Sequence, residues 1–152
     1  MKSLQSLASF FLIVGLVYYS FFSLMPQKGS PSSVEETKFS TERALIPLKE
    51  ITKAPHYIGT KEHARVRNYL ISQLEELGLE TQVQEGFVIN PKWKSLDKPK
   101  NIIAKIQGSE NGKSLLLLSH YDSALTPSYG ASDAGSGIVT ILETLRAYRA
   151  SG

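Results

Sequence analysis

The organisation of this chain is set by residues 114–137, which read SLLLLSHYDSALTPSYGASDAGSG. Four consecutive leucines run into a polar cluster that contains His120 and Asp122. A loop follows, and Asp133 then stands among small residues before a new apolar periodicity that starts at Ile138. An apolar run, a polar loop and a helical periodicity are typical of a strand, a crevice loop and a helix. His120 and Asp133 are therefore expected where the strand ends and the helix begins.

The composition is that of one globular domain of modest size. The chain has 152 residues, of which 41% are hydrophobic and 20% are charged. The net charge of +3 is not gathered into a basic stripe, so no nucleic-acid partner is expected. The absence of cysteine excludes disulfide bonds, a thiol nucleophile and cysteine-ligated zinc.

An uncharged stretch predicts a membrane segment within residues 1–27. Its core, residues 4–25, is long enough to cross a bilayer as a helix. A cleaved signal peptide is the competing interpretation, but bulky residues such as Phe21 and Phe22 stand where small ones would be needed. We expect a single-pass anchor, and the slight charge bias around it favours a non-cytoplasmic soluble part. Residues 28–41, rich in Pro, Gly, Ser and charge, are expected to be a linker with little burial.

Residues 42–152 are expected to form an α/β domain. Apolar periodicity predicts helices over residues 41–52, 60–78 and 136–150. Alternation and apolar runs predict strands over residues 79–89, 101–107 and 114–119. The leucines of the last strand indicate burial on both faces, as in the middle of an α/β sheet. We expect His56 to be structural or on the surface, assign no function to His63, and expect Trp93 to pack beneath its loop.

The residue types of the polar cluster suit a divalent metal ion. A histidine at a strand end can present one ring nitrogen to a metal, and its other nitrogen then needs an acceptor. Asp122 suits that second role, because residues two apart in an extended chain point to the same side. Asp133 offers hard oxygen atoms, can bridge two cations and precedes a helix N-terminus. From spacing alone, a metal site and an ordinary polar loop stay equally open.

Two other kinds of site are disfavoured. His120, Asp122 and Ser123 have the residue types of a hydrolytic triad, but sequence neighbours cannot normally place the base between its two partners. Residues 130–134 approach G-x-S-x-G, yet that motif needs a strand directly before the serine, and a loop with Pro127 intervenes. The glycine-rich segment also lacks the Lys-Ser/Thr pair of a phosphate-binding loop.

Both motifs resemble those of the M28 family of zinc metallopeptidases. LLLLSHYDS, followed by YGASDAGSGIVTILETLR, is most similar to membrane-anchored members of aminopeptidase type, related to vacuolar and endoplasmic reticulum membrane proteases. Upstream, PHYIGTKEHARVRNYLISQLEELGLETQVQE resembles the segment that opens the catalytic domain, and NIIAKIQG resembles the strand before the metal-bearing one. The resemblance implies the first half of a three-layer α/β/α zinc-exopeptidase-like domain with a mixed sheet.

The resemblance also implies roles for matching residues. His120 would ligate one zinc ion, Asp122 would orient His120, and Asp133 would bridge two zinc ions. The peptide bond between Asp133 and Ala134 would be cis, as it often is in the family. The complete enzyme would remove N-terminal residues from a peptide substrate, with zinc activating water and stabilising the oxyanion.

Family members continue with a Glu-Glu pair, a further Asp and a His. Past Asp133 the only carboxylate side chain here is Glu143, on a helix whose periodicity assigns it to packing and surface. We therefore expect the N-terminal portion of such an enzyme, inactive and weakly metal-binding by itself. The alternative is a membrane-tethered, non-catalytic binding or interaction module with the same partial fold.

Overall fold

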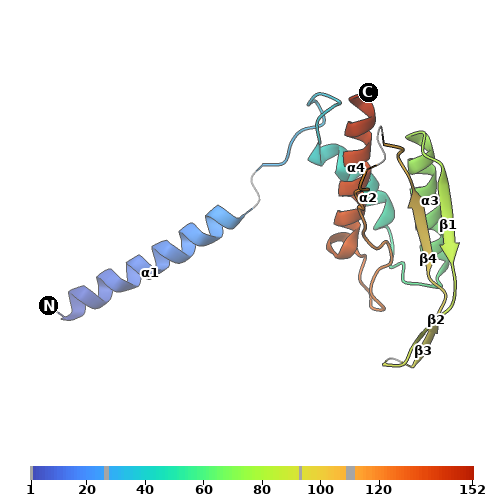
Figure 1. Ribbon diagram of the computed structural model, residues 1–152. Helices are drawn as coiled ribbons and strands as arrows, with labels where there is room; N and C mark the ends of the chain where they lie inside the picture. The colour runs from blue at the N-terminus through green and yellow to red at the C-terminus, as the bar shows by residue number, and fades with distance from the viewer. Residues whose placement is uncertain (1, 26–27, 93, 109–111) are drawn as a thin grey trace.

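The computed structural model describes residues 2–25, 28–92, 94–108 and 112–152, so Trp93 lies outside the described residues. A long N-terminal helix precedes an α/β body (Figure 1). The elements of the chain are α1 (Lys2–Leu24), α2 (Thr41–Ile51), α3 (Lys61–Glu76), β1 (Thr81–Glu85), β2 (Val88–Asn90), β3 (Ser95–Asp97), β4 (Lys100–Ala104), the wide turn η1 (Ala131–Gly135) and α4 (Ser136–Ala150).

Helix α1 coincides with the predicted membrane segment. Residues Leu4–Leu24 have a mean hydropathy of 2.0, and none of their most apolar window is buried in the body. A helix of 23 residues is about 34 Å long, slightly more than the hydrocarbon core of a bilayer. Length and composition therefore allow α1 to cross a membrane.

The body helices begin and end within one or two residues of the predicted bounds. Thr60 caps α3, because its hydroxyl oxygen accepts a hydrogen bond from the amide of His63 at 3.0 Å. Gly78 follows this helix with φ +73°, and the amide of Leu79 then donates to the carbonyl of Leu74 at 3.1 Å. This left-handed ending turns the chain into β1.

The sheet is smaller than expected and antiparallel rather than mixed. Strands β1 and β4 pair with Val83 opposite Ile102, and β2 pairs separately with β3. The predicted strand over residues 79–89 is thus two strands, which belong to two different pairs. Helix α3 packs against β1 and β4, which confirms the α/β class.

The predicted strand over residues 114–119 is wrong for this structure. Residues 112–130 have no regular secondary structure and form no ladder among the described residues. Leu115, Leu116 and Leu118 are 85%, 76% and 77% exposed, so the predicted burial on both faces is wrong too. The reason is nonlocal: a strand needs a hydrogen-bonded neighbour, and no described segment supplies one here.

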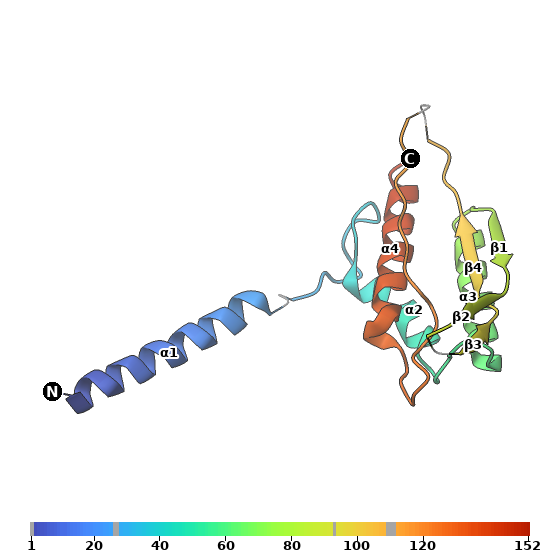
Figure 2. The ribbon, with the colours of Figure 1, turned by 60° about the horizontal axis from the view of Figure 1, so that its bottom comes forward.

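The core lies between the three body helices. Helix α2 packs against α4, and α3, which contacts β1 and β4, lies on the other side of the body (Figures 1 and 2). The buried apolar side chains of this core are Ala44, Ile51, Val66, Leu70, Val139 and Leu142. Arg149 near the end of α4 donates to the carbonyl of Leu77 at 3.0 Å, which joins the ends of α4 and α3.

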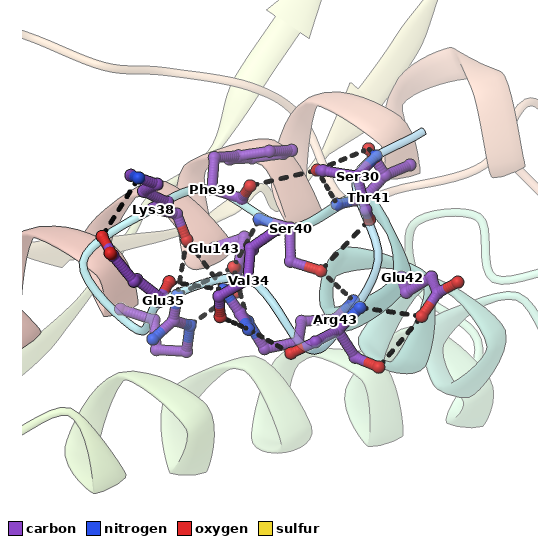
Figure 3. Close-up of polar contacts among 12 residues, drawn as sticks. Ser30, Val34, Glu35, Lys38, Phe39, Ser40, Thr41, Glu42, Arg43 and Glu143 are labelled. Carbon is purple, nitrogen blue, oxygen red and sulfur yellow. Dashed lines mark hydrogen bonds and ion pairs between the residues drawn. The ribbon is translucent and has the colours of Figure 1, made fainter. Parts of the chain in front are cut away.

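Residues 28–40, which we call the collar, fold back onto α2 and α4 (Figure 3). The expectation of a linker with little burial is wrong at Ser40, which is fully buried and caps α2. Arg43 binds four collar carbonyl groups, including those of Ser32 and Lys38. The polar composition of the collar is therefore used in hydrogen bonds to the body.

Candidate metal centre

The structure brings His120 and Asp133 together. The Nε2 atom of His120 lies 2.9 Å from Oδ1 of Asp133, thirteen residues away in sequence. The Nδ1 atom of His120 lies 3.1 Å from the carbonyl oxygen of Asp122 and 3.4 Å from its Oδ1. Each ring nitrogen therefore faces one of the two aspartates.

The site is open to solvent, and its charges favour a protonated histidine. The side chains of His120 and Asp133 are 52% and 85% exposed. Partial burial lowers the pKa of His120. The hydrogen bonds to Asp133 and to the Asp122 carbonyl, together with the negative charges of the two aspartates, have the larger effect, so the pKa is raised overall. A cation therefore suits the space between these residues, whether it is the proton of His120 or a metal ion.

The wide turn η1 places Asp133 opposite His120. Gly130 begins the turn with φ +67°, and its carbonyl accepts from the amide of Gly135 at 2.8 Å. Asp133 departs from helical angles, with φ −123° and ψ 93°, and its peptide bond to Ala134 is cis, as the resemblance implies. Ser119 donates to the carbonyl of Ala134 at 3.2 Å, which ties the turn to the segment that carries His120.

A buried contact among His56, Ser123 and Gly130 fixes the loop between the two motifs. The amide of His56 donates to Oγ of Ser123 at 2.9 Å, and the amide of Ser123 donates back to the carbonyl of His56 at 3.3 Å. Both side chains are only 2% exposed. A Cβ atom at Gly130 would lie 3.1 Å from Cβ of Ser123, so this glycine packs closely against Ser123. His56 is thus structural, as expected.

Sequence reasoning missed how His63 supports the polar cluster. Its ring stacks on Tyr121 with centroids 4.7 Å apart and an angle of 9° between the planes. The Tyr121 hydroxyl donates to the carbonyl of Lys100 at 2.7 Å, so the residue after His120 is tied to both α3 and β4. Burial lowers the pKa of His63, which therefore stacks as a neutral ring. Its place in the first helical turn gave no signal of this contact.

The donor set fits part of a zinc site. A tetrahedral zinc ion with ordinary bond lengths would hold a histidine nitrogen and a carboxylate oxygen about 3.4 Å apart. The 2.9 Å between His120 and Asp133 needs to widen by only a few tenths of an ångström. Among the described residues, no group of three or more His, Cys, Asp or Glu side chains gathers at one point. Two candidate ligands thus converge, against the three of an ordinary catalytic zinc site.

A groove of about 500 Å³ lies beside this centre rather than at it. Its walls are residues 116–119 and four residues at the start of α4. Neither His120 nor Asp133 lines it. Gly137 makes the close approach possible, since a Cβ there would lie 2.5 Å from Oγ of Ser119.

Comparison with known proteins bears on the same segment. Residues 101–152, which include both motifs, match the model of Peptidase family M28. The chain is 28% identical over 150 residues to a vacuolar membrane protease of Schizosaccharomyces pombe and 30% identical over 156 residues to one of Vanderwaltozyma polyspora. The resemblance to the M28 peptidases is thereby confirmed. These alignments cover 91% and 89% of this chain.

Solved structures support a zinc-exopeptidase-like fold. A zinc-dependent exopeptidase from Parabacteroides distasonis has a TM-score of 0.63 and 26% identity, over 74% of this chain and 42% of its own. A glutaminyl cyclase of Porphyromonas gingivalis has a TM-score of 0.64 and 26% identity, over 73% of this chain and 40% of its own. The chain spans only 17% and 16% of the length of the two curated proteases.

Proposed function

We propose that this chain is the N-terminal part of a membrane-anchored zinc aminopeptidase. The observation that carries the proposal is the convergence of His120 Nε2 and Asp133 Oδ1 within a segment that matches the M28 family. Peptidase names among the sequence relatives favour proteolysis. The structural likeness alone fits an exopeptidase and a glutaminyl cyclase equally well.

Three residues have assigned roles in this proposal. His120 and Asp133 would hold zinc, with Asp133 as the bridge if two ions bind. Asp122 would keep His120 in the tautomer and orientation that leave Nε2 free for the metal, because its carbonyl lies 3.1 Å from Nδ1. Zinc, when bound, would polarise the substrate carbonyl and lower the pKa of water. The exposed position of His120 and Asp133 leaves room for a peptide N-terminus to approach.

The isolated 152-residue chain is proposed to be inactive. His120 and Asp133 are the two candidate ligands that converge, and further ligands and a general base would come from other parts of the longer protein. The same longer protein would pair with the exposed leucines of residues 115–118. Helix α1 would anchor the protein through residues 4–25, with the body on the non-cytoplasmic side.

Zinc titration of the full 152-residue chain in detergent micelles tests the assignment. We expect weak binding that His120→Ala and Asp133→Ala abolish, while Asp97→Asn, at a carboxylate bonded to Ser95 in β3, leaves it unchanged. Tight, stoichiometric binding that survives His120→Ala would sink the ligand assignment. Reading the coding sequence past codon 152 separates the two functions: a Glu-Glu pair and a later His support the enzyme, and their absence favours a non-catalytic interaction module.

A further inference from the structure

The collar begins close to the end of α1. Met25 and Lys28 are three residues apart, so they lie within about 11 Å of each other whatever path the chain takes. Ser30 is already held by the body: its hydroxyl donates to the carbonyl of Phe39 at 3.1 Å, and its carbonyl accepts from the amide of Glu42 at 3.2 Å. Only a short step of chain therefore separates α1 from residues fixed to α2.

Glu143 is the centre of the contacts that hold the collar (Figure 3). This carboxylate, with its side chain only 4% exposed, accepts the amide of Ser40 at 2.9 Å and Nε of Arg43 at 3.0 Å. Its other oxygen accepts Nε of Arg146 at 2.8 Å, and Arg146 also donates to the collar carbonyl of Lys38 at 3.1 Å. One buried carboxylate thus joins α4, α2 and the collar.

The contacts differ from those of an ordinary surface ion pair. Arg43 donates to Glu143 and to the carbonyls of four collar residues, which are Ser32, Val34, Glu35 and Lys38. Ser40 lies fully buried beneath them and donates its hydroxyl to the carbonyl of Pro31 at 2.9 Å. Removing a buried charged partner leaves unsatisfied groups, so such a cluster holds one arrangement of the chain.

The collar and the candidate metal centre lie toward opposite ends of α4. The collar contacts Glu143 and Arg146, whereas Asp133 precedes the first turn of the helix. From Ser136 at the start of α4, Glu143 and Arg146 lie seven and ten residues along the helix, which corresponds to about 10 and 15 Å along its axis. Figures 1 and 2 agree, since the loop that carries Asp133 lies at the end of α4 away from the collar.

We propose that the collar is a folded joint that holds the membrane-side end of the body at α1 and keeps the His120–Asp133 centre on the side away from the bilayer. A flexible tether of 13 residues would instead let the body move by roughly 20 Å. The inference rests on the proposed anchoring by α1, and it adds that the peptide substrate reaches the centre from the aqueous phase.

Hydrogen exchange of the full chain in detergent micelles tests the joint without a bilayer. Amides of residues 40–43 are expected to be protected, and Glu143→Gln should remove that protection. The matched control is Glu50→Gln, at a carboxylate 31% exposed and paired with Arg65, which should leave the collar protected. If Glu143→Gln also unfolds α3, Ser40→Ala provides the second test, since it deletes only hydroxyl contacts and should release residues 30–43 alone. Collar amides that exchange like an unstructured peptide in the unaltered chain would overturn the joint.

The absence of cysteine allows a second test in nanodiscs with single introduced cysteines. A dye on Glu36→Cys in the collar should be quenched by headgroup nitroxides more strongly than a dye on Leu125→Cys, which is 79% exposed in the loop before Gly130. Equal or stronger quenching at Leu125→Cys would refute the proposed placement. A dye on Ser20→Cys in α1 reports anchoring separately: if acyl-chain nitroxides fail to quench it, the anchor has failed, and the exchange test of the collar still stands.

Discussion

Gly130→Ala is expected to destabilise the turn that carries Asp133, for two separable reasons. The residue has φ +67°, and an L-residue in the left-handed region costs about 1–2 kcal/mol. The added methyl would also lie 3.1 Å from Cβ of Ser123 and 3.3 Å from Cε1 of His56. Both neighbours are 2% exposed and hydrogen-bonded to each other, so crowding should add about 1–3 kcal/mol.

Two other glycines separate these contributions. Gly59 has φ +91° with no atom within 4 Å of the new Cβ, so Gly59→Ala measures backbone strain alone. Gly86 also has open space and carries no positive φ, so Gly86→Ala should change little. The expected order of destabilisation is Gly130→Ala, then Gly59→Ala, then Gly86→Ala.

Hydrogen exchange of the core amides in α4 measures the loss as a free energy of opening. A total near 3 kcal/mol corresponds to exchange faster by roughly a hundredfold for Gly130→Ala. Gly59→Ala should accelerate exchange by about tenfold. If the free energies of opening of the two variants differ by less than about 0.5 kcal/mol, the close packing at Gly130 adds no destabilisation and the reasoning is wrong.

Glu143→Gln should lower the free energy of unfolding by about 3 kcal/mol, because it leaves the partly buried donors of Arg43 and Arg146 without the buried carboxylate. Glu50→Gln, at a side chain that is 31% exposed, should cost at most about 1 kcal/mol, and thermal unfolding compares the two. Burial opposes ionisation of Glu143, but its hydrogen bonds have the larger effect and lower its pKa. The stability that ionised Glu143 contributes is therefore complete above the ordinary glutamate pKa of about 4.3, and it is lost as the pH falls through the pKa of the folded state. Equal acid dependence in Glu143→Gln would contradict this. Burial lowers the pKa of His63, so stability should fall below about pH 6.5, and His63→Phe should remove that component in denaturant titrations at pH 5 and 7. Replacing Leu116 and Leu118 together by Thr should reduce self-association of the chain, and an unchanged mass by light scattering would count against an exposed adhesive segment.

The local parts of the fold follow from the sequence. Thr60 and Gly78 carry the capping chemistry that defines α3, and both act on amides within a few residues. The sequence also places His120 just after an apolar run and Asp133 just before a helix, and their side chains lie 2.9 Å apart, although the apolar run forms no strand among the described residues. The resemblance to the M28 family added the cis bond after Asp133.

The failures depend on partners far away in sequence. The leucines at 115–118 have the composition of a buried strand, but a ladder requires neighbours that no local pattern supplies. Glu143 looks like a surface residue on an amphipathic helix, and its burial comes from Arg43, one hundred residues earlier. The collar has the composition of a linker, yet its carbonyls are what Arg43 binds. The composition of a segment therefore does not show which distant residues will contact it.

The contact between Arg149 and the end of α3 has a consequence for synthesis on the ribosome. Arg149 donates to the carbonyl of Leu77, and Glu143 is joined to Arg43, so both of these contacts tie α4 to segments made before it. The helical layer can therefore dock as soon as α4 leaves the exit tunnel, as expected for folding that proceeds from the N-terminus. The leucine segment emerges just ahead of α4 and stays exposed at that moment. This is the interval in which the nascent chain would most need a chaperone that binds apolar, extended polypeptide.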